Sequence, residues 1–237
     1  MFAEFTEALF SIFFVETLIN GLLLGGVLAL LSLGLNLIFG VIDVVWICYA
    51  EIIMLGMYTI YFLHVDGGMP LIAAVACGVG VTACLGWLTH RLVIGYLLQA
   101  APINQLLATG GLLFFFQGAA MVAFGVEFRS LGVSLGSLAL SEDIYLSWTR
   151  LLSFTIAAGV VVVLYQFLAR SYLGAAIRAI SQDREIMILM GVDTKKLYLL
   201  TSAIGGGLAG LAAALLALQY DVHPFIGLSF GPITFMI

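Results

Sequence analysis

The chain alternates between long apolar segments and short polar connections. Six segments are each long enough to cross a membrane, which takes about 20 residues in a helix. The pattern therefore predicts an all-α, polytopic transmembrane helix bundle with about six spans. Glycines four residues apart, Gly21 with Gly25 and Gly206 with Gly210, predict close packing between helices. The apolar segments cover residues 9–33, 36–63, 70–92, 103–124, 151–168 and 197–220.

Two charged residues, Asp43 and Glu51, lie inside the second segment, residues 36–63. A charged side chain near the bilayer centre costs about 2.5 to 3.5 kcal/mol, so each needs a partner, an interfacial position or a wet cavity. Neighbouring glycines favour a broken or re-entrant segment, which would place Asp43, Trp46, Tyr49 and Glu51 beside a translocation path. The alternative is a helix in which Glu51 supports packing through hydrogen bonds and Asp43 sits at the cytoplasmic interface.

Charge is concentrated in one stretch, residues 170–196. The whole chain is 63% hydrophobic and 9% charged, yet eight of its 21 formal charges and five of its eight basic residues fall there. If every segment crosses, one side receives six basic residues and the other receives two, so the positive-inside bias makes residues 170–196 a cytoplasmic loop. We expect one transmembrane domain over residues 1–237. The six are Arg91, Arg170, Arg178, Arg184, Lys195 and Lys196, against Arg129 and Arg150.

Within this loop the sequence predicts a short helix over residues 182–190. Ser181 is the expected N-cap, with Asp183 and Glu185 in the first turn, where they suit the helix dipole. Gly191 is the expected C-terminal stop. Such an amphipathic helix can lie on lipid, pack on its own bundle or enter a groove on a partner.

Two motifs that would indicate nucleotide binding or metal-dependent hydrolysis are missing from the sequence. It contains no GxxxxGK[ST] phosphate loop and no HExxH motif. His64, His90 and His223 stand at segment ends without metal-ligand spacing, and three cysteines sit inside apolar runs. We therefore predict no enzyme activity, no cofactor and no metal site.

The charged loop resembles a known family. The stretch RAISQDREIMILMGVDTKKLYLLTSAIGGGLAGLAAAL is similar to the cytoplasmic loop and following helix of branched-chain amino acid ABC transporter permeases. In that family the loop supplies a coupling helix that fits a cleft on a separate ATPase. Met187 stands where the family usually has alanine. The resemblance implies ATPase coupling for Arg178, Asp183, Arg184, Glu185, Met190, Gly191 and Asp193.

A second resemblance lies near the start of the chain. NGLLLGGVLALLSLGLNLIFGVIDVV is similar to the family's first span, and AEIIMLGMY resembles its GEF-MLGAY pattern. Residues 46–50 replace the usual Asn, Phe, Ala, His and Gly, which predicts a different cargo or an altered gate. The Trp and Tyr found there would suit an aromatic or larger apolar solute by stacking. After HPFIG the family usually continues into a Gly-rich segment and further spans, so we expect a shortened chain.

The resemblance implies the permease subunit of an ATP-binding cassette importer in a bacterial or archaeal cytoplasmic (inner) membrane. Its cargo would be branched-chain amino acids or a related small polar solute, urea and short amides included. Implied partners are a homologous second permease, two cytoplasmic ABC ATPase subunits, an extracytoplasmic solute-binding protein and membrane lipid, with no nucleic acid. The alternative is an ion-coupled secondary transporter or channel, in which Asp43 and Glu51 carry protons or ions.

Overall fold

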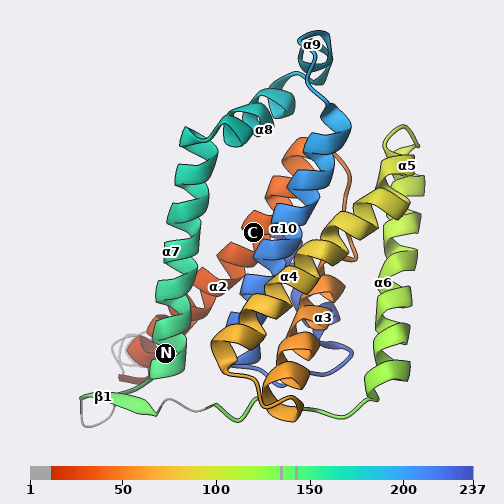
Figure 1. The fold of residues 1–237 in the computed structure, drawn as a ribbon. Helices are drawn as coiled ribbons and strands as arrows, with labels where there is room; N and C mark the ends of the chain where they lie inside the picture. The colour runs from red at the N-terminus through yellow and green to blue at the C-terminus, as the bar shows by residue number, and fades with distance from the viewer. Residues whose placement is uncertain (1–11, 134–135, 142–143, 237) are drawn as a thin grey trace, which may run out of the picture.

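Five helices in the part of the chain that the structure describes are long and apolar enough to cross a membrane. The computed structural model describes residues 12–133, 136–141 and 144–236. The predicted all-α polytopic bundle is confirmed (Figure 1). The five long helices are α2 (Ile12–Ile42), α4 (Leu71–Thr89), α6 (Pro102–Phe124), α7 (Trp148–Arg170) and α10 (Thr194–Ala217). Shorter elements are α3 (Tyr49–Tyr61), η1 (Phe62–Asp66), η2 (His90–Ile94), α5 (Gly95–Leu97), β1 (Ser137–Ser141), β2 (Ile144–Ser147), α8 (Tyr172–Gln182), α9 (Arg184–Leu189) and α11 (Ile226–Met236).

The first helix is longer than its apolar segment predicted. A boundary was expected between residues 33 and 36, but α2 continues without interruption to Ile42. Gly34 does not break the helix; a side chain there would collide with the Tyr49 hydroxyl and the Cβ atom of Leu208. This glycine therefore serves close packing. The helix ends where Asp43 adopts a left-handed backbone conformation, with a φ of 57°.

The second predicted span is broken. Residues 43–48 form no regular secondary structure, and the helix α3 begins only at Tyr49. A broken backbone at membrane depth is tolerated where protein satisfies its polar groups. Here the hydroxyl of Thr109 in α6 donates to the carbonyl oxygen of Val45 over 3.1 Å. Val44 and Trp46 are buried, so this segment runs through the inside of the bundle.

Helix α10 forms the centre of the bundle and packs on α4, α2 and α3. The predicted role of Gly206 and Gly210 is confirmed, because Cβ atoms on them would lie 2.5 Å from the Thr82 carbonyl oxygen and 2.8 Å from the Val79 Cα atom. Close backbone approach is how helices associate in lipid. The other predicted pair behaves differently: Cβ atoms on Gly21 and Gly25 would meet nothing within 4 Å in the described part of the chain.

This packing can be tested with two adjacent glycines. Gly206→Ala will lower the thermal stability of the purified protein by about 1 to 3 kcal/mol, since its methyl group meets backbone atoms that cannot move aside. Gly207→Ala is the matched control: its Cβ atom would have its nearest neighbour at 3.8 Å, and alanine favours a helix by up to about 1 kcal/mol. Melting curves in detergent should move in opposite directions. Equal shifts would mean that α4 and α10 are not held by this contact.

The loops at one end of the bundle are joined by short stretches of paired backbone. Strands β1 and β2 form an antiparallel hairpin between α6 and α7, which the sequence pattern did not predict. In the same connection, the backbones of Arg129 and Val222 exchange hydrogen bonds of 3.0 and 2.7 Å. The long connection between α6 and α7 is thereby tied to the turn that follows α10.

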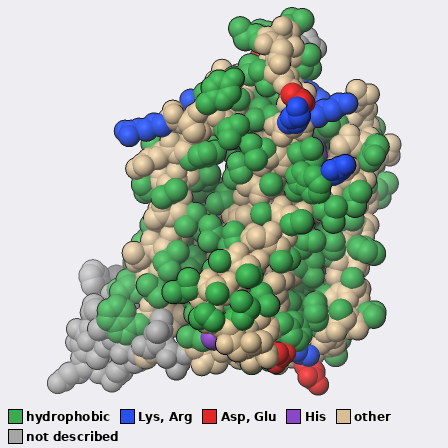
Figure 2. All heavy atoms as spheres, in the orientation of Figure 1, with side chains coloured by type: hydrophobic (Ala, Val, Ile, Leu, Met, Phe, Trp, Pro, Cys, Tyr) green, Lys and Arg blue, Asp and Glu red, His purple; other side chains and the backbone are tan. Residues whose placement is uncertain are grey.

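Basic residues gather at the opposite end. Lys and Arg side chains lie around α8, α9 and the nearby helix ends, while hydrophobic side chains cover much of the sides (Figures 1 and 2). Arg91 lies in η2, Arg170 ends α7, and Lys195 and Lys196 lie in the first turn of α10. The six basic residues that were predicted to share one side therefore lie at the same end of the bundle. This agrees with a cytoplasmic position for that end.

Candidate translocation path and coupling element

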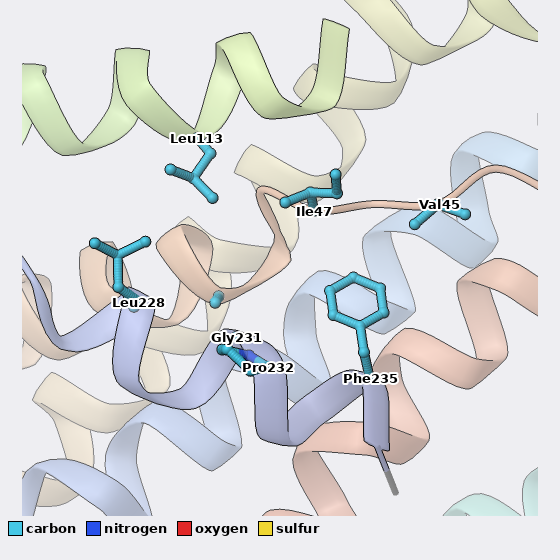
Figure 3. A pocket seen from close by; sticks show the side chains of 9 residues that line it. Val45, Ile47, Leu113, Leu228, Gly231, Pro232 and Phe235 are labelled. Carbon is cyan, nitrogen blue, oxygen red and sulfur yellow. The ribbon is translucent and has the colours of Figure 1, made fainter. Parts of the chain in front are cut away.

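The broken span borders an apolar pocket of about 420 Å³. One wall is the non-helical segment, a second is α6 and the third is α11 (Figure 3). The side chains of Ile47, Leu113, Leu228 and Phe235 surround the space in this view. A lining of this kind holds apolar groups and offers few hydrogen bonds. The lining residues are Val45, Ile47, Ala50, Leu113, Gly227, Leu228, Gly231, Pro232 and Phe235.

A second pocket, of about 210 Å³, adjoins the first. Val45 and Phe235 line both pockets, so the two pockets are neighbours. This pocket is more polar, because Asn36, Trp46 and Thr234 contribute to its lining. The indole Nε1 of Trp46 is buried and has no hydrogen-bond partner among the described residues.

Glu51 is fully buried, and neither carboxyl oxygen has a hydrogen-bond partner in the described part of the chain. Its carboxyl group lies against Gly227 at the start of α11: a Cβ atom on this glycine would come within 2.6 to 2.8 Å of the carboxyl atoms. Gly227 also lines the apolar pocket. An unpartnered carboxyl group at this depth is costly, which is typical of residues kept for function.

The other two residues predicted for the path lie elsewhere. Asp43 is exposed at the end of α2, where its N–H donates to the Phe39 carbonyl oxygen over 2.9 Å. Tyr49 is buried, and its hydroxyl donates to the Gly205 carbonyl oxygen over 3.1 Å. Trp46 lines the second pocket, and Glu51 approaches the first through Gly227. Asp43 and Tyr49 line neither of these two pockets.

Most lining residues escaped the sequence-based prediction. Val45, Ile47, Leu113 and Phe235 are apolar residues in an apolar chain, so hydropathy cannot separate them from lipid-facing positions. Pro232 was the available signal, since a proline inside a short helix marks irregular backbone. The helix that contains it, α11, lies beyond the six predicted segments.

The coupling element differs from its predicted form. The expected single helix over residues 182–190 with a Ser181 cap is wrong: α8 continues to Gln182, and α9 covers only Arg184–Leu189. Ser181 lies inside α8 and donates to the Arg178 carbonyl oxygen over 2.8 Å. Asp183 is the cap instead. Its side chain accepts a 3.0 Å hydrogen bond from the Ile186 N–H, and its extended backbone ends α8.

The predicted C-terminal stop is confirmed. Gly191 has a φ of 80°, and the N–H groups of Gly191 and Val192 donate to the carbonyl oxygens of Ile188 and Met187 over 3.0 and 3.1 Å. This is a Schellman motif, which satisfies the last carbonyl groups of α9. Hydrogen bonds at both ends therefore fix this short helix.

Apolar side chains are exposed on α9 and just beyond it. Leu189 is 86% exposed and Met190 is 76% exposed, while Ile186 and Ile188 are about half exposed. The helix projects past the ends of α7 and α10 (Figure 1). An apolar tip in this position is typical of a surface that a partner covers.

The charged residues of the element have separate surroundings. Arg178 is exposed on α8, and the Arg184 guanidinium lies 5.1 Å from the centre of the Tyr198 ring. Asp193 caps α10 and pairs with Lys196 over 3.0 Å. Hydrogen bonds from Lys196 lower the pKa of Asp193. Glu185 belongs to α9, but its side chain lies outside those that the structure describes.

Comparisons with known proteins agree with this picture. The family model described as "Branched-chain amino acid transport system / permease component" matches residues 17–237. The permease protein BraD of Pseudomonas aeruginosa is 30% identical over 232 residues, which cover 92% of this chain and 76% of that protein. LivH of Escherichia coli is 26% identical over 234 residues, or 93% of this chain and 76% of its own. Both are named as permease proteins of high-affinity branched-chain amino acid transport systems.

A putative glucose ABC transporter permease protein of Haloferax volcanii is 31% identical over 166 residues, covering 66% of this chain and 48% of the relative. No solved structure matches the chain. The family match covers nearly the whole chain and includes the broken span and the charged loop. The chain therefore belongs to the family of permease components of branched-chain amino acid transport systems.

Proposed function

We propose that this chain forms one half of the translocation path of an ATP-driven importer for branched-chain amino acids or a related small polar solute. The observation that carries the proposal is the broken span, whose residues 45–47 line two adjoining pockets together with α11. In a membrane, backbone leaves the helical state where it lines a path or a binding site. The permease is a multi-pass membrane protein that does no covalent chemistry itself.

The pocket lining supports an aliphatic cargo. The wall of the 420 Å³ pocket is almost wholly apolar, and burying a branched aliphatic side chain there would stabilise it by about 1.5 to 3 kcal/mol. Positions 46–50 hold two aromatic residues, and of these only Trp46 lines a pocket. The other, Tyr49, donates its hydroxyl group to the Gly205 carbonyl oxygen. Aromatic stacking by both residues is therefore poorly supported.

Glu51 supplies the polar half of the proposal. An amino acid carries an ammonium group, and a buried carboxylate without a partner is its natural counter-charge. Gly227 carries only a hydrogen where it meets the carboxyl group, so a modest shift of α11 would expose Glu51 to the pocket. The carboxyl group would then contact the ammonium while the apolar wall holds the side chain.

The exposed end of the bundle at α9 supports a proposal about the partner subunits. We infer that a cytoplasmic ABC ATPase covers the exposed apolar tip at Leu189 and Met190, and that a second permease and an extracytoplasmic solute-binding protein complete the importer. Closure of two ATPases would displace α9, whose two ends are connected to the bundle at Asp183 and Gly191. The displacement would be transmitted to α10 by direct contact with α9, and to α2 through α8.

Reconstitution tests the function. Vesicles that contain the chain with its second permease, its ATPases and its solute-binding protein should accumulate labelled leucine, isoleucine or valine only when ATP is inside with the ATPases. The matched control is the same assembly with hydrolysis-deficient ATPases, which should show background uptake. Uptake that persists without ATPases and follows a proton or sodium gradient would instead establish an ion-coupled transporter. ATP-driven uptake of another solute alone would contradict the proposed cargo.

A further inference from the structure

A pocket of about 220 Å³ lies between the end of the second long helix and the start of α10. Its polar lining comes from two places in the sequence: His90, Arg91 and Tyr96 near η2 and α5, and Lys195 and Tyr198 in α10. Apolar residues, Leu98 and Leu199 among them, complete the wall. The pocket is distinct from the translocation path and from the tip of α9.

The charge of this pocket is positive and unbalanced. Arg91 and Lys195 are exposed, and neither is paired with a carboxylate in the described part of the chain. The neighbouring Lys196 differs, because it pairs with Asp193 over 3.0 Å and lines a different pocket. The Arg184 guanidinium over the Tyr198 ring adds a further cation near by. Two cations from separate helices, without a carboxylate partner among the described residues, thus line one pocket.

His90 forms part of the pocket wall, but it is only 3% exposed, and its unpartnered ring atom Nδ1 is buried. The charged groups that a ligand can reach are therefore the Arg91 guanidinium and the Lys195 ammonium, both on exposed residues. Both groups are positive and only donate hydrogen bonds. The matching ligand group is thus an anion that accepts hydrogen bonds.

The position of the pocket along the membrane spans indicates which anion it binds. His90 and Arg91 lie near the end of the apolar span Leu71–Leu97, and Lys195 is the second residue of the span Thr194–Ala217. The pocket therefore lies at the cytoplasmic membrane boundary, where lipid phosphates are found. Arg91 also lies 5.0 Å from the centre of the Trp87 ring, an aromatic–cation pair typical of this depth. We propose that this pocket binds the phosphate of an anionic lipid headgroup, with an acyl chain along its apolar wall.

Native mass spectrometry of the full chain, with added phosphatidylglycerol or phosphatidylethanolamine, tests the proposal. Each basic residue near an anionic surface is worth roughly fivefold in affinity, so Arg91→Ala combined with Lys195→Ala should weaken phosphatidylglycerol retention about 25-fold. Lys196→Ala is the matched control and should leave retention unchanged, because this lysine is already paired. Equal retention of the two lipids, or an equal loss in the control, would overturn the proposal.

Trp87 locates the bound lipid. In vesicles, Trp148→Phe leaves Trp87 and the buried Trp46 as the emitting residues. Phosphatidylglycerol with brominated chains should quench the emission more strongly than brominated phosphatidylcholine, and the Arg91 and Lys195 substitutions should remove the difference. Release of the quenching by millimolar inorganic phosphate would show a site for free phosphate instead. If lipid preference is absent while the double substitution weakens ATPase binding, the pocket is a protein contact and the lipid proposal is wrong.

Discussion

Replacing Leu189 and Met190 together with aspartate will abolish ATP-driven uptake while leaving the chain folded in the membrane. Both side chains are more than three-quarters exposed, so they contribute little to the bundle itself. At a protein interface, an apolar anchor that is lost costs about 2 kcal/mol or more, or roughly 30-fold in affinity. Two carboxylates would also have to lose water when a partner covers this tip, which is costly. Binding of the ATPase to the purified permease, measured beside uptake, checks this expectation.

The control for this double substitution adds two negative charges to α8, the helix before α9. Ser181→Asp with Gln182→Glu introduces two carboxylates at exposed positions of α8 but removes no exposed apolar side chain. We expect near-normal uptake from this variant. If both pairs abolish uptake equally, charge in the loop is responsible and docking through the apolar tip is contradicted. A monodisperse profile in detergent must accompany each variant, so that loss of folding is recognised.

Glu51→Gln will lower uptake about 10- to 100-fold without lowering stability. The substitution keeps the shape of the side chain but removes the charge that would contact the ammonium group of the solute, and a hydrogen bond to a charged group is worth about 1.5 to 3 kcal/mol. Stability should stay constant or rise, because the wild-type carboxyl group is buried without a partner. Normal uptake by this variant would assign Glu51 to packing.

Gly227 allows the structural and transport roles of Glu51 to be separated. Gly227→Ala will destabilise the protein by up to about 3 kcal/mol, since the new methyl group would come within 2.6 to 2.8 Å of the carboxyl atoms of Glu51, and this buried side chain would have to shift. Adding Glu51→Ala removes the collision and should restore the melting temperature but not uptake. The control is Gly231→Ala, which lines the same pocket and would make an ordinary 3.6 Å contact with Ala50. Restored uptake in the double variant would show that Glu51 has no part in transport.

Hydropathy predicted the long helices well, because a membrane span needs one continuous apolar run. The segments 70–92, 103–124 and 151–168 correspond closely to α4, α6 and α7. The boundary between the first two spans was missed for a physical reason. Gly34 reads as a helix breaker in sequence, yet it serves a tertiary contact with Tyr49, which lies fifteen residues later in the chain.

Local chemistry misplaced the helix of the charged loop by two residues. Ser181 and Asp183 are both good N-caps, and propensity alone cannot rank two such residues so close together. The choice depends on α8, whose Ile177 and Ile180 are buried in the core of the bundle. With α8 held by this packing, Ser181 remains inside it, and Asp183 is the first residue beyond it and caps α9. Information of this kind comes from tertiary contacts and not from the local sequence.

The residues shared by the two pockets have a consequence for how the pockets could join. Val45 and Phe235 each line both pockets, and both side chains are apolar. Hydrophobic constrictions of this kind gate by dewetting. We expect rotation of the Phe235 ring to be enough to connect the two pockets, so a change confined to α11 could join them without any movement of the long helices.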